Sequence, residues 1–215
     1  MVHVYGMCVE GLPDPKEHPE LMKDFSLERK EKTLRYLQAK DRRQSLGAGL
    51  LLNRVLQRHG FCMDDMIFGE HGKPEISGLC FNMSHSHDYV ICVVSDKAVG
   101  CDVEKIGKFR EKMAERYFTD KEAAFLNAFK EEEKTDVFYR IWTMKESYVK
   151  MTGEGIQLGF KRCEFRLDDS VNVYRDGALC DCFIKEYPLD GYKVSICAQE
   201  NTFSNAIEFL DLMEK

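Results

Sequence analysis

The sequence of 215 residues has no long apolar run, no CxxC pair and no signal-like N-terminus. Its apolar stretches, such as residues 89–94, are far too short to cross a bilayer. Residues 1–5 lack the basic and long apolar regions of a secretory signal peptide. We therefore expect a cytoplasmic protein that has no membrane partner.

The nine cysteines follow no pattern typical of disulfide bonds or of zinc sites. Their number is odd, and most lie within apolar runs, where a free cysteine behaves as a small hydrophobic residue. Cys180 and Cys182 are close in sequence, but no second cysteine or histidine pair stands at zinc-site spacing. We interpret the cysteines as free and structural.

Positive charge is in the minority, because 31 Lys and Arg side chains face 37 Asp and Glu side chains, which gives a net charge of -6. We therefore expect no nucleic-acid partner. Residues 26–43 differ from this average, because they hold seven basic side chains and three acidic ones. This segment is either a solvated helical face or a local site for phosphate or an acidic partner.

The remaining composition, 44% hydrophobic and 32% charged, is that of an ordinary globular protein. Apolar periodicity and capping residues predict helices over residues 26–37, 41–58, 119–129 and 135–152, with the acidic run 131–133 as a solvated turn. Strands are predicted over residues 2–9, 66–68, 89–95, 98–104, 163–167, 171–175, 182–187 and 192–198. Each half has helices followed by strands, so we expect an α+β fold of two packed subdomains, residues 1–100 and 101–215.

A pair of carboxylates stands at the end of the apolar strand predicted over residues 98–104. Side chains at i and i+2 of a strand point to the same face, so Asp102 and Glu104 are expected to lie side by side. Neighbouring carboxylates repel each other unless a cation lies between them, and hard oxygen ligands suit Mg2+ or Mn2+. An ordinary solvated strand end is the alternative interpretation.

The helix predicted over residues 135–152 carries a second group of this kind. Trp142, Glu146 and Lys150 recur at every fourth position and so lie roughly along one stripe. An ion pair between Glu146 and Lys150 beside an apolar Trp142 would be an ordinary helical arrangement. However, charges so close to large apolar neighbours usually have a specific partner.

Two further segments are rich in groups that bind ligands. The HGKP turn carries Lys73 between a glycine, which lets the backbone approach a ligand, and a proline, which fixes the chain direction. The FNMSHSH run holds Ser84, His85 and His87. We interpret this run as a polar loop with one functional histidine, and two histidine metal ligands at strand spacing are the alternative.

In this order, the segments HGKP, FNMSHS, VGCDVE and WTMKESYVK resemble the phosphopantetheinyl transferase family. The similarity is to its long, surfactin-type branch, and its motifs extend from Gly72 to Lys150. Chain length and the basic segment of residues 29–43 agree with it. The resemblance implies two similar α+β subdomains related by a pseudo-twofold axis, with the active site at their interface within a monomer.

Residue by residue, the resemblance implies three sets of functional side chains. The ligands of Mg2+ or Mn2+ would be Asp102, Glu104 and Glu146. The catalytic residues would be Glu146 and Lys150. Coenzyme A, the co-substrate, would be bound by Lys32, Arg43, Lys73, Ser84, His85 and Lys150, with Arg42 or Gln44 as alternatives to Arg43.

The implied activity is transfer of the 4'-phosphopantetheine group from coenzyme A to a serine of an apo carrier protein (acyl, peptidyl or aryl), with release of adenosine 3',5'-bisphosphate. Fatty-acid, polyketide and nonribosomal-peptide carriers remain open as partners. A Mg2+-dependent phosphatase is one alternative, but it leaves HGKP and SHS unexplained. A non-catalytic coenzyme A-binding module is another, but the presence of all three carboxylates and Lys150 disfavours it.

Overall fold

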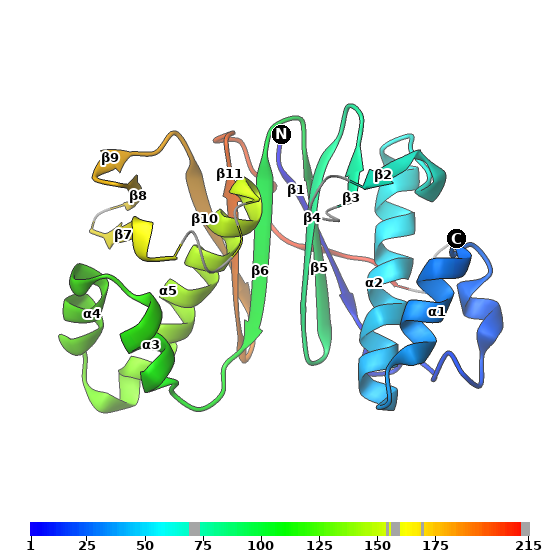
Figure 1. Ribbon diagram of the computed structural model, residues 1–215, viewed down its shortest axis with the longest axis horizontal. Coiled ribbons are helices and arrows are strands. Elements are labelled where there is room, and N and C mark those ends of the chain that lie inside the picture. Colours follow the sequence, from blue (N-terminus) through cyan, green and yellow to red (C-terminus); the bar gives the residue numbers. More distant parts are fainter. Residues whose placement is uncertain (69–73, 154, 156–159, 169, 212–215) are drawn as a thin grey trace.

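A computed structural model describes residues 1–68, 74–153, 155, 160–168 and 170–211 (Figure 1). The helices are α1 (Leu27–Arg35), α2 (Ala39–Arg58), α3 (Glu111–Tyr117), α4 (Asp120–Asn127) and α5 (Glu131–Thr152). The strands are β1 (His3–Cys8), β2 (Met66–Phe68), β3 (Pro74–Ile76), β4 (Cys80–Ser86), β5 (Tyr89–Ser95), β6 (Val99–Lys105), β7 (Cys163–Leu167), β8 (Val171–Arg175), β9 (Ala178–Leu179), β10 (Phe183–Leu189), β11 (Tyr192–Ala198) and β12 (Glu208–Phe209). Lys73 and the preceding residues 69–72 lie outside the described residues, whereas Pro74 of the predicted turn begins β3.

Two of the four sheets among the described residues have the same strand order, apart from β12 at the edge of the first. In the first half β1 pairs antiparallel with β5 and β5 with β4, and in the second half β6 pairs antiparallel with β11 and β11 with β10. In each half a long helix, α2 or α5, lies between the first strand and the hairpin. Figure 1 shows the two sheets in the middle of the molecule, with α2 and α5 on their outer sides. The prediction of an α+β fold with two similar halves is confirmed.

The C-terminal segment returns to the first half. Strand β12 pairs in parallel with β1, and Phe203 forms a parallel bridge with Val2. Leu210 is buried in the core of the first half. The chain thus connects the two halves twice, once where it enters β6 and once through this returning segment. The subdomain boundary near residue 100 stays a prediction.

Strand β5 is apolar on both faces because it lies between two cores. Val90, Cys92 and Val94 pack with α2 in the first core, whereas Ile91 and Val93 pack against the second sheet. Burial of a valine or isoleucine side chain from water contributes about 1.5–3 kcal/mol. The central core formed in this way holds the two sheets together.

Strand β6 has one apolar face, and its other face lies against α5. The residues of β6 that enter the central core are Val99, Cys101 and Val103. On the opposite face, a Cβ atom on Gly100 would lie 2.1 Å from Ser147 O and 2.4 Å from Met151 N of α5. No side chain fits there unless the helix backbone moves. Helix α5 therefore lies directly on β6, beside the carboxylates that follow Gly100.

Most of the predicted elements are confirmed, with ends that differ by one or two residues. The predicted caps are present too, since Ser26 Oγ accepts from Arg29 N at 3.2 Å and Thr119 forms a capping box with Glu122. All nine cysteines are free, as interpreted. Helix α3 and the strands β3, β4, β9 and β12 were not predicted.

The acidic run 131–133 is not a solvated turn, and that prediction is wrong. These residues form the first turn of α5. Acidic side chains are favourable there because they oppose the partial positive charge of a helix N-terminus. In addition, Glu133 Oε2 accepts a hydrogen bond from Lys130 N at 3.2 Å, which satisfies one backbone donor ahead of the helix.

A buried ion pair ties α4 to α5 and β7. Lys145 and Glu122 are both fully buried, and Lys145 Nζ donates to the two Glu122 oxygens at 2.9 and 2.8 Å and to Cys163 O at 2.6 Å. Glu122 Oε1 also accepts from Phe165 N at 2.8 Å. Burial lowers the pKa of Lys145, and the nearby Glu122 carboxylate opposes that shift. The pair is thus a structural feature of the second half.

Removal of one partner of this pair should destabilise the protein strongly. Lys145→Met leaves a buried carboxylate without a cation. We therefore expect the free energy of unfolding, measured in urea, to fall by about 3–5 kcal/mol. The matched control is Lys121→Met, because Lys121 is 64% exposed and pairs with Glu164 at 3.1 Å. An exposed pair contributes about 0–1 kcal/mol. Equal losses for the two variants would contradict this account.

Candidate active site

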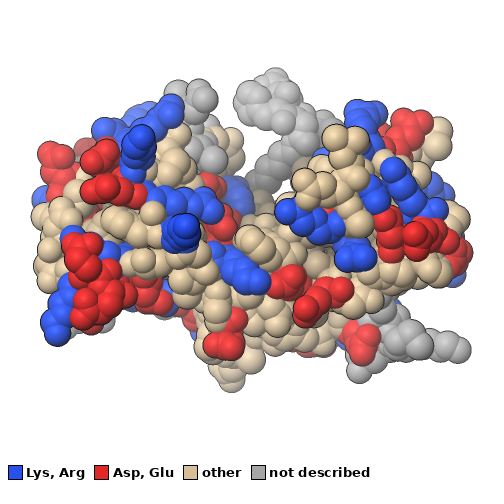
Figure 2. Space-filling view, turned by 90° about the horizontal axis from the view of Figure 1, so that it is seen from below, with Lys and Arg blue, Asp and Glu red and all other residues tan. Residues whose placement is uncertain are grey.

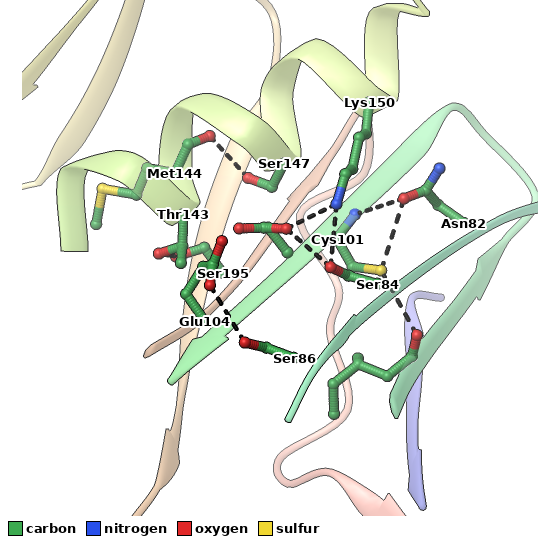
Figure 3. Close-up of polar contacts among 12 residues, drawn as sticks. Asn82, Ser84, Ser86, Cys101, Glu104, Thr143, Met144, Ser147, Lys150 and Ser195 are labelled. Carbon is green, nitrogen blue, oxygen red and sulfur yellow. Dashed lines mark hydrogen bonds and ion pairs between the residues drawn. The ribbon is translucent and has the colours of Figure 1, made fainter. Parts of the chain in front are cut away.

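The FNMSHS segment forms strand β4, so its prediction as a polar loop is wrong. Its polar residues Asn82, Ser84 and Ser86 alternate and therefore share one face of the strand. This face meets β6, where Cys101 N donates to Asn82 Oδ1 at 3.1 Å (Figure 3). Lys105 N donates to Ser86 Oγ at 3.1 Å. The polar side chains are therefore satisfied by the other half of the molecule, which makes a strand stable here.

Asp102, Lys150 and Ser84 form one hydrogen-bonded group at the junction of the two halves. Asp102 is 4% exposed, and its Oδ1 accepts from Lys150 Nζ at 2.6 Å and from Ser84 Oγ at 2.8 Å. Lys150 Nζ also donates to Ser84 Oγ at 3.0 Å (Figure 3). Lys150 thus connects α5 with β6 and β4. The group joins one side chain from each of these three elements.

Two further carboxylates lie near this group. Glu104 follows Asp102 on the same face of β6 and accepts from Ser86 Oγ at 3.2 Å, and Glu146 lies one turn before Lys150 on α5. Burial raises the pKa of all three carboxyl groups, and the charge of Asp102 adds to this for the other two, so that Glu146 reaches about 7. Burial opposes the charged form of Lys150, yet Asp102 and Glu146 leave its pKa above the ordinary value. Three carboxyl groups and one ammonium group thus interact electrostatically at this junction, and Asp102 contacts the ammonium group directly.

The donor set of this cluster fits a divalent cation. Asp102 Oδ2 is buried and has no hydrogen-bond partner among the described residues, although buried carboxylate oxygens normally have one. When all three carboxyl groups are ionised, the lysine neutralises one of them, which leaves an excess of two negative charges. Within the described ranges, no three His, Cys, Asp or Glu side chains are already arranged around a common metal position. The fit therefore rests on the orphaned oxygen, the charge excess and the hard oxygen ligands.

A cleft of about 450 Å3 lies beside the cluster, between α1, α2 and β4. Its lining includes Arg29, Lys32, Gln44, Phe81 and His85. Burial lowers the pKa of His85, and the charges of Lys150 and Arg29 lower it further, whereas Asp102 raises it. His85 is therefore within electrostatic reach of both the cleft and the carboxylate cluster.

The structure separates the three neighbouring candidates of α2. Arg42 is engaged within the fold, because it donates to Asp14 and to the carbonyl oxygens of Tyr36 and Leu37 at 2.8 and 2.7 Å. Gln44 lines the cleft and donates from Nε2 to His87 O at 2.8 Å.

Arg43 and Ser84 do not occur among the residues that line the cleft as described, and Ser84 lies with the carboxylates instead. Lys73 lies outside the described residues. Of the residues predicted to bind coenzyme A, the structure thus brings Lys32 and His85 together in the cleft. Ser84 and Lys150 lie together with the predicted metal ligands.

Arg29 is a candidate binding residue that the sequence reasoning did not single out. It lines the cleft, its Nη2 donates to Ser45 O at 3.1 Å, and its buried Nε has no partner among the described residues. The sequence did hold a signal for Arg29, because it lies three residues before Lys32, and residues at i and i+3 share one face of a helix. What the sequence did not indicate is which face of α1 is turned toward β4.

The surface outside the cleft has no single dominant charge on the face that Figure 2 shows. Acidic and basic side chains are interspersed there over both halves. In the described ranges, no helix combines the length and the apolar character that a membrane span needs.

Comparison with known proteins agrees with this geometry. A model of the 4'-phosphopantetheinyl transferase superfamily matches residues 98–197, which include β6, α5 and the three carboxylates. The 4'-phosphopantetheinyl transferase Sfp of Bacillus subtilis is 32% identical over 98% of this chain and 98% of its own length. The 4'-phosphopantetheinyl transferase gsp of Aneurinibacillus migulanus is 31% identical over 86% of this chain and 81% of its own.

Among solved structures, a holo-(acyl-carrier-protein) synthase from Bacillus anthracis, in complex with CoA (3',5'-ADP), aligns with 47% of this chain and 93% of its own, with a TM-score of 0.41 and 21% identity. That similarity is too low to support an argument about the site. The sequence relatives span nearly the whole chain at more than 30% identity. The chain therefore belongs to the 4'-phosphopantetheinyl transferase superfamily.

Proposed function

We propose that the chain transfers the 4'-phosphopantetheine group of coenzyme A to a serine of an apo carrier protein and releases adenosine 3',5'-bisphosphate. The observation that carries this proposal is the position of the cluster of Lys150, Asp102 and Ser84 next to a cleft that is lined in part by Arg29 and Lys32. Binding and phosphoryl transfer thus have adjoining places in one site. The names of the relatives, which are 4'-phosphopantetheinyl transferases, support it.

In this proposal coenzyme A lies in the cleft, with its phosphate groups toward Arg29, Lys32 and His85. Arg29 is half-buried, and its buried Nε has no partner among the described residues, which favours an anionic ligand because charge-assisted hydrogen bonds to phosphate are strong. Arg43 and Lys73 remain predicted contributors. We further propose that the protein is a cytoplasmic monomer, since both sheets of the site come from one chain.

The reaction requires positioning and charge compensation more than covalent help. The carrier serine oxygen forms a bond to the β-phosphorus of coenzyme A, and the bond from that phosphorus to the bridging oxygen breaks. Glu146, whose pKa is raised to about 7, accepts the serine proton directly or through water. Lys150 stabilises the negative charge that grows on the leaving phosphate.

The residues that would hold Mg2+ are Asp102, Glu104 and Glu146. When bound, Mg2+ would neutralise charge on the pyrophosphate oxygens as a Lewis acid. Ser84 keeps Asp102 in place from the opposite half of the molecule, because its Oγ donates to Oδ1 at 2.8 Å. The contact of Lys150 with the same oxygen places its ammonium group beside the proposed metal site.

Transfer should depend on a divalent cation and on Asp102. Incubation with coenzyme A, Mg2+ and an apo carrier should add one phosphopantetheine to the carrier, as measured by mass spectrometry. Excess chelator or Asp102→Asn, which removes the charge with little change of shape, should abolish the product. Asp96→Asn is the control, because Asp96 is an exposed partner of the N-terminus. Full modification in excess chelator would contradict the proposal.

Replacement of Lys150 should lower kcat far more than it lowers stability. If Lys150 stabilises the transition state, Lys150→Ala should reduce kcat by about 10²–10³-fold while coenzyme A binding changes less. Lys150→Arg should restore only part of the rate, because a planar guanidinium cannot replace a compact ammonium in place.

The control for this prediction is Lys185→Ala, since Lys185 Nζ bonds Ser204 O at 2.8 Å. That variant should keep its rate. If Lys150 has only a structural role through its ion pair with Asp102, its loss lowers stability and leaves kcat unchanged. A folded Lys150→Ala protein with normal kcat would remove the residue from the mechanism.

A further inference from the structure

The second serine of β4, Ser86, is a buried side chain to which neither the sequence nor the mechanism assigns a role. It is 8% exposed, and its Oγ donates to Glu104 Oε2 at 3.2 Å (Figure 3). The same Oγ accepts from Lys105 N, the residue after Glu104, at 3.1 Å. Ser86 thus contacts β6 from the other half of the molecule at two consecutive residues.

The contacts with Glu104 and Lys105 indicate the direction of the hydroxyl group, and a longer contact of 3.5 Å joins the same Oγ to Nδ1 of the neighbouring His87. A serine hydroxyl has one hydrogen to donate and two lone pairs that accept. The amide of Lys105 occupies a lone pair and fixes the oxygen against the backbone of β6. With the oxygen held in this way, the hydrogen can be directed at Glu104 Oε2.

The arrangement repeats one step along the strands. Ser84 donates to Asp102 Oδ1 at 2.8 Å, and two residues later Ser86 donates to Glu104 Oε2 at 3.2 Å. Because both pairs follow the two-residue period of a strand, β4 presents one hydroxyl to each carboxylate of β6. A long glutamate side chain has more rotatable bonds than aspartate and therefore gains more from such a contact.

We propose that Ser86 is a positioning residue that orients the Glu104 carboxylate for a divalent cation. This inference rests on the proposed function, in which Glu104 is a ligand of Mg2+. Groups that hydrogen-bond a metal-binding carboxylate orient it and raise metal affinity, and their loss typically costs 10–100-fold. Ser86 itself contacts neither coenzyme A nor the reacting phosphate in this account.

The test compares Ser86→Ala with Ser95→Ala, a matched buried serine outside the site. Ser95 is 3% exposed, donates to Glu200 Oε2 at 3.1 Å and accepts from Lys97 N at 3.3 Å. Replacement of Ser95 by alanine therefore removes the same two kinds of contact as in Ser86→Ala, one donated to a carboxylate and one accepted from a backbone amide. Binding of Mn2+ to the protein saturated with coenzyme A is measured by the electron paramagnetic resonance signal of free Mn2+. Unfolding in urea is measured in parallel.

We expect Ser86→Ala to raise the Kd for Mn2+ by about 10–100-fold. Ser95→Ala should leave this Kd unchanged while it loses similar stability. Ser86→Thr, which keeps the hydroxyl, should restore the Kd to within about threefold of the wild type, a result that a purely structural role does not predict. Ser86→Cys, a weak donor of similar shape, serves as a second variant if Ser86→Ala does not fold, and its Kd should also rise.

An unchanged Kd in folded Ser86→Ala or Ser86→Cys would overturn the inference and leave Ser86 as a structural contact. A different result would show that the proposed function, and not only the role of Ser86, is wrong. If the wild-type protein with coenzyme A binds no Mn2+ at all, the metal site itself is wrong, and the positioning role falls with it.

Discussion

The close contact between α5 and β6 at Gly100 is the constraint on which the candidate site depends. A Cβ atom at this position would lie within 2.1–2.4 Å of backbone atoms of α5, so the helix lies directly on the strand only because residue 100 is glycine. Two residues further along the same face stands Asp102, and the helix above it carries Glu146 and Lys150. Backbone packing thus brings the buried carboxylates and the ammonium group together, and the 2.6 Å contact of Lys150 with Asp102 follows from it.

The second requirement is that two half-structures meet at this point. The first half contributes the basic cleft and the hydroxyl groups of β4, whereas the second contributes the carboxylates and Lys150. Neither half alone satisfies its polar groups, since Ser84 and Asp102 are partners across the junction. Both sheets contribute to an apolar central core, and the burial of its side chains offsets the free-energy cost of burying these charged groups. The site and the packing of the halves are therefore the same physical feature.

Local sequence patterns predicted most of the elements and the side-chain pairs that lie on one element. Long-range contacts determine how these elements come together in the site. The two-residue period of β6 and the four-residue period of α5 placed Asp102 with Glu104 and Glu146 with Lys150 correctly on their own elements. The sequence could not show that α5 lies over β6, nor that β4 is a strand, because its serines look like loop residues until β6 supplies their partners. Arg29 was missed for the same reason, since only the packing of α1 against α2 shows which basic residues line the cleft. The roles given to these residues remain proposals.

Replacement of Gly100 by alanine tests the central claim most directly. The added methyl group must push α5 away from β6, and a displacement of about 1 Å in a catalytic group can cost about 100-fold in rate. We therefore predict that Gly100→Ala folds, as judged by circular dichroism, but transfers phosphopantetheine about 100-fold more slowly. Gly11→Ala is the control, because no described atom beyond the two adjacent residues lies within 4 Å of a Cβ at that position. A folded Gly100→Ala protein with the kcat of the wild type would contradict the account.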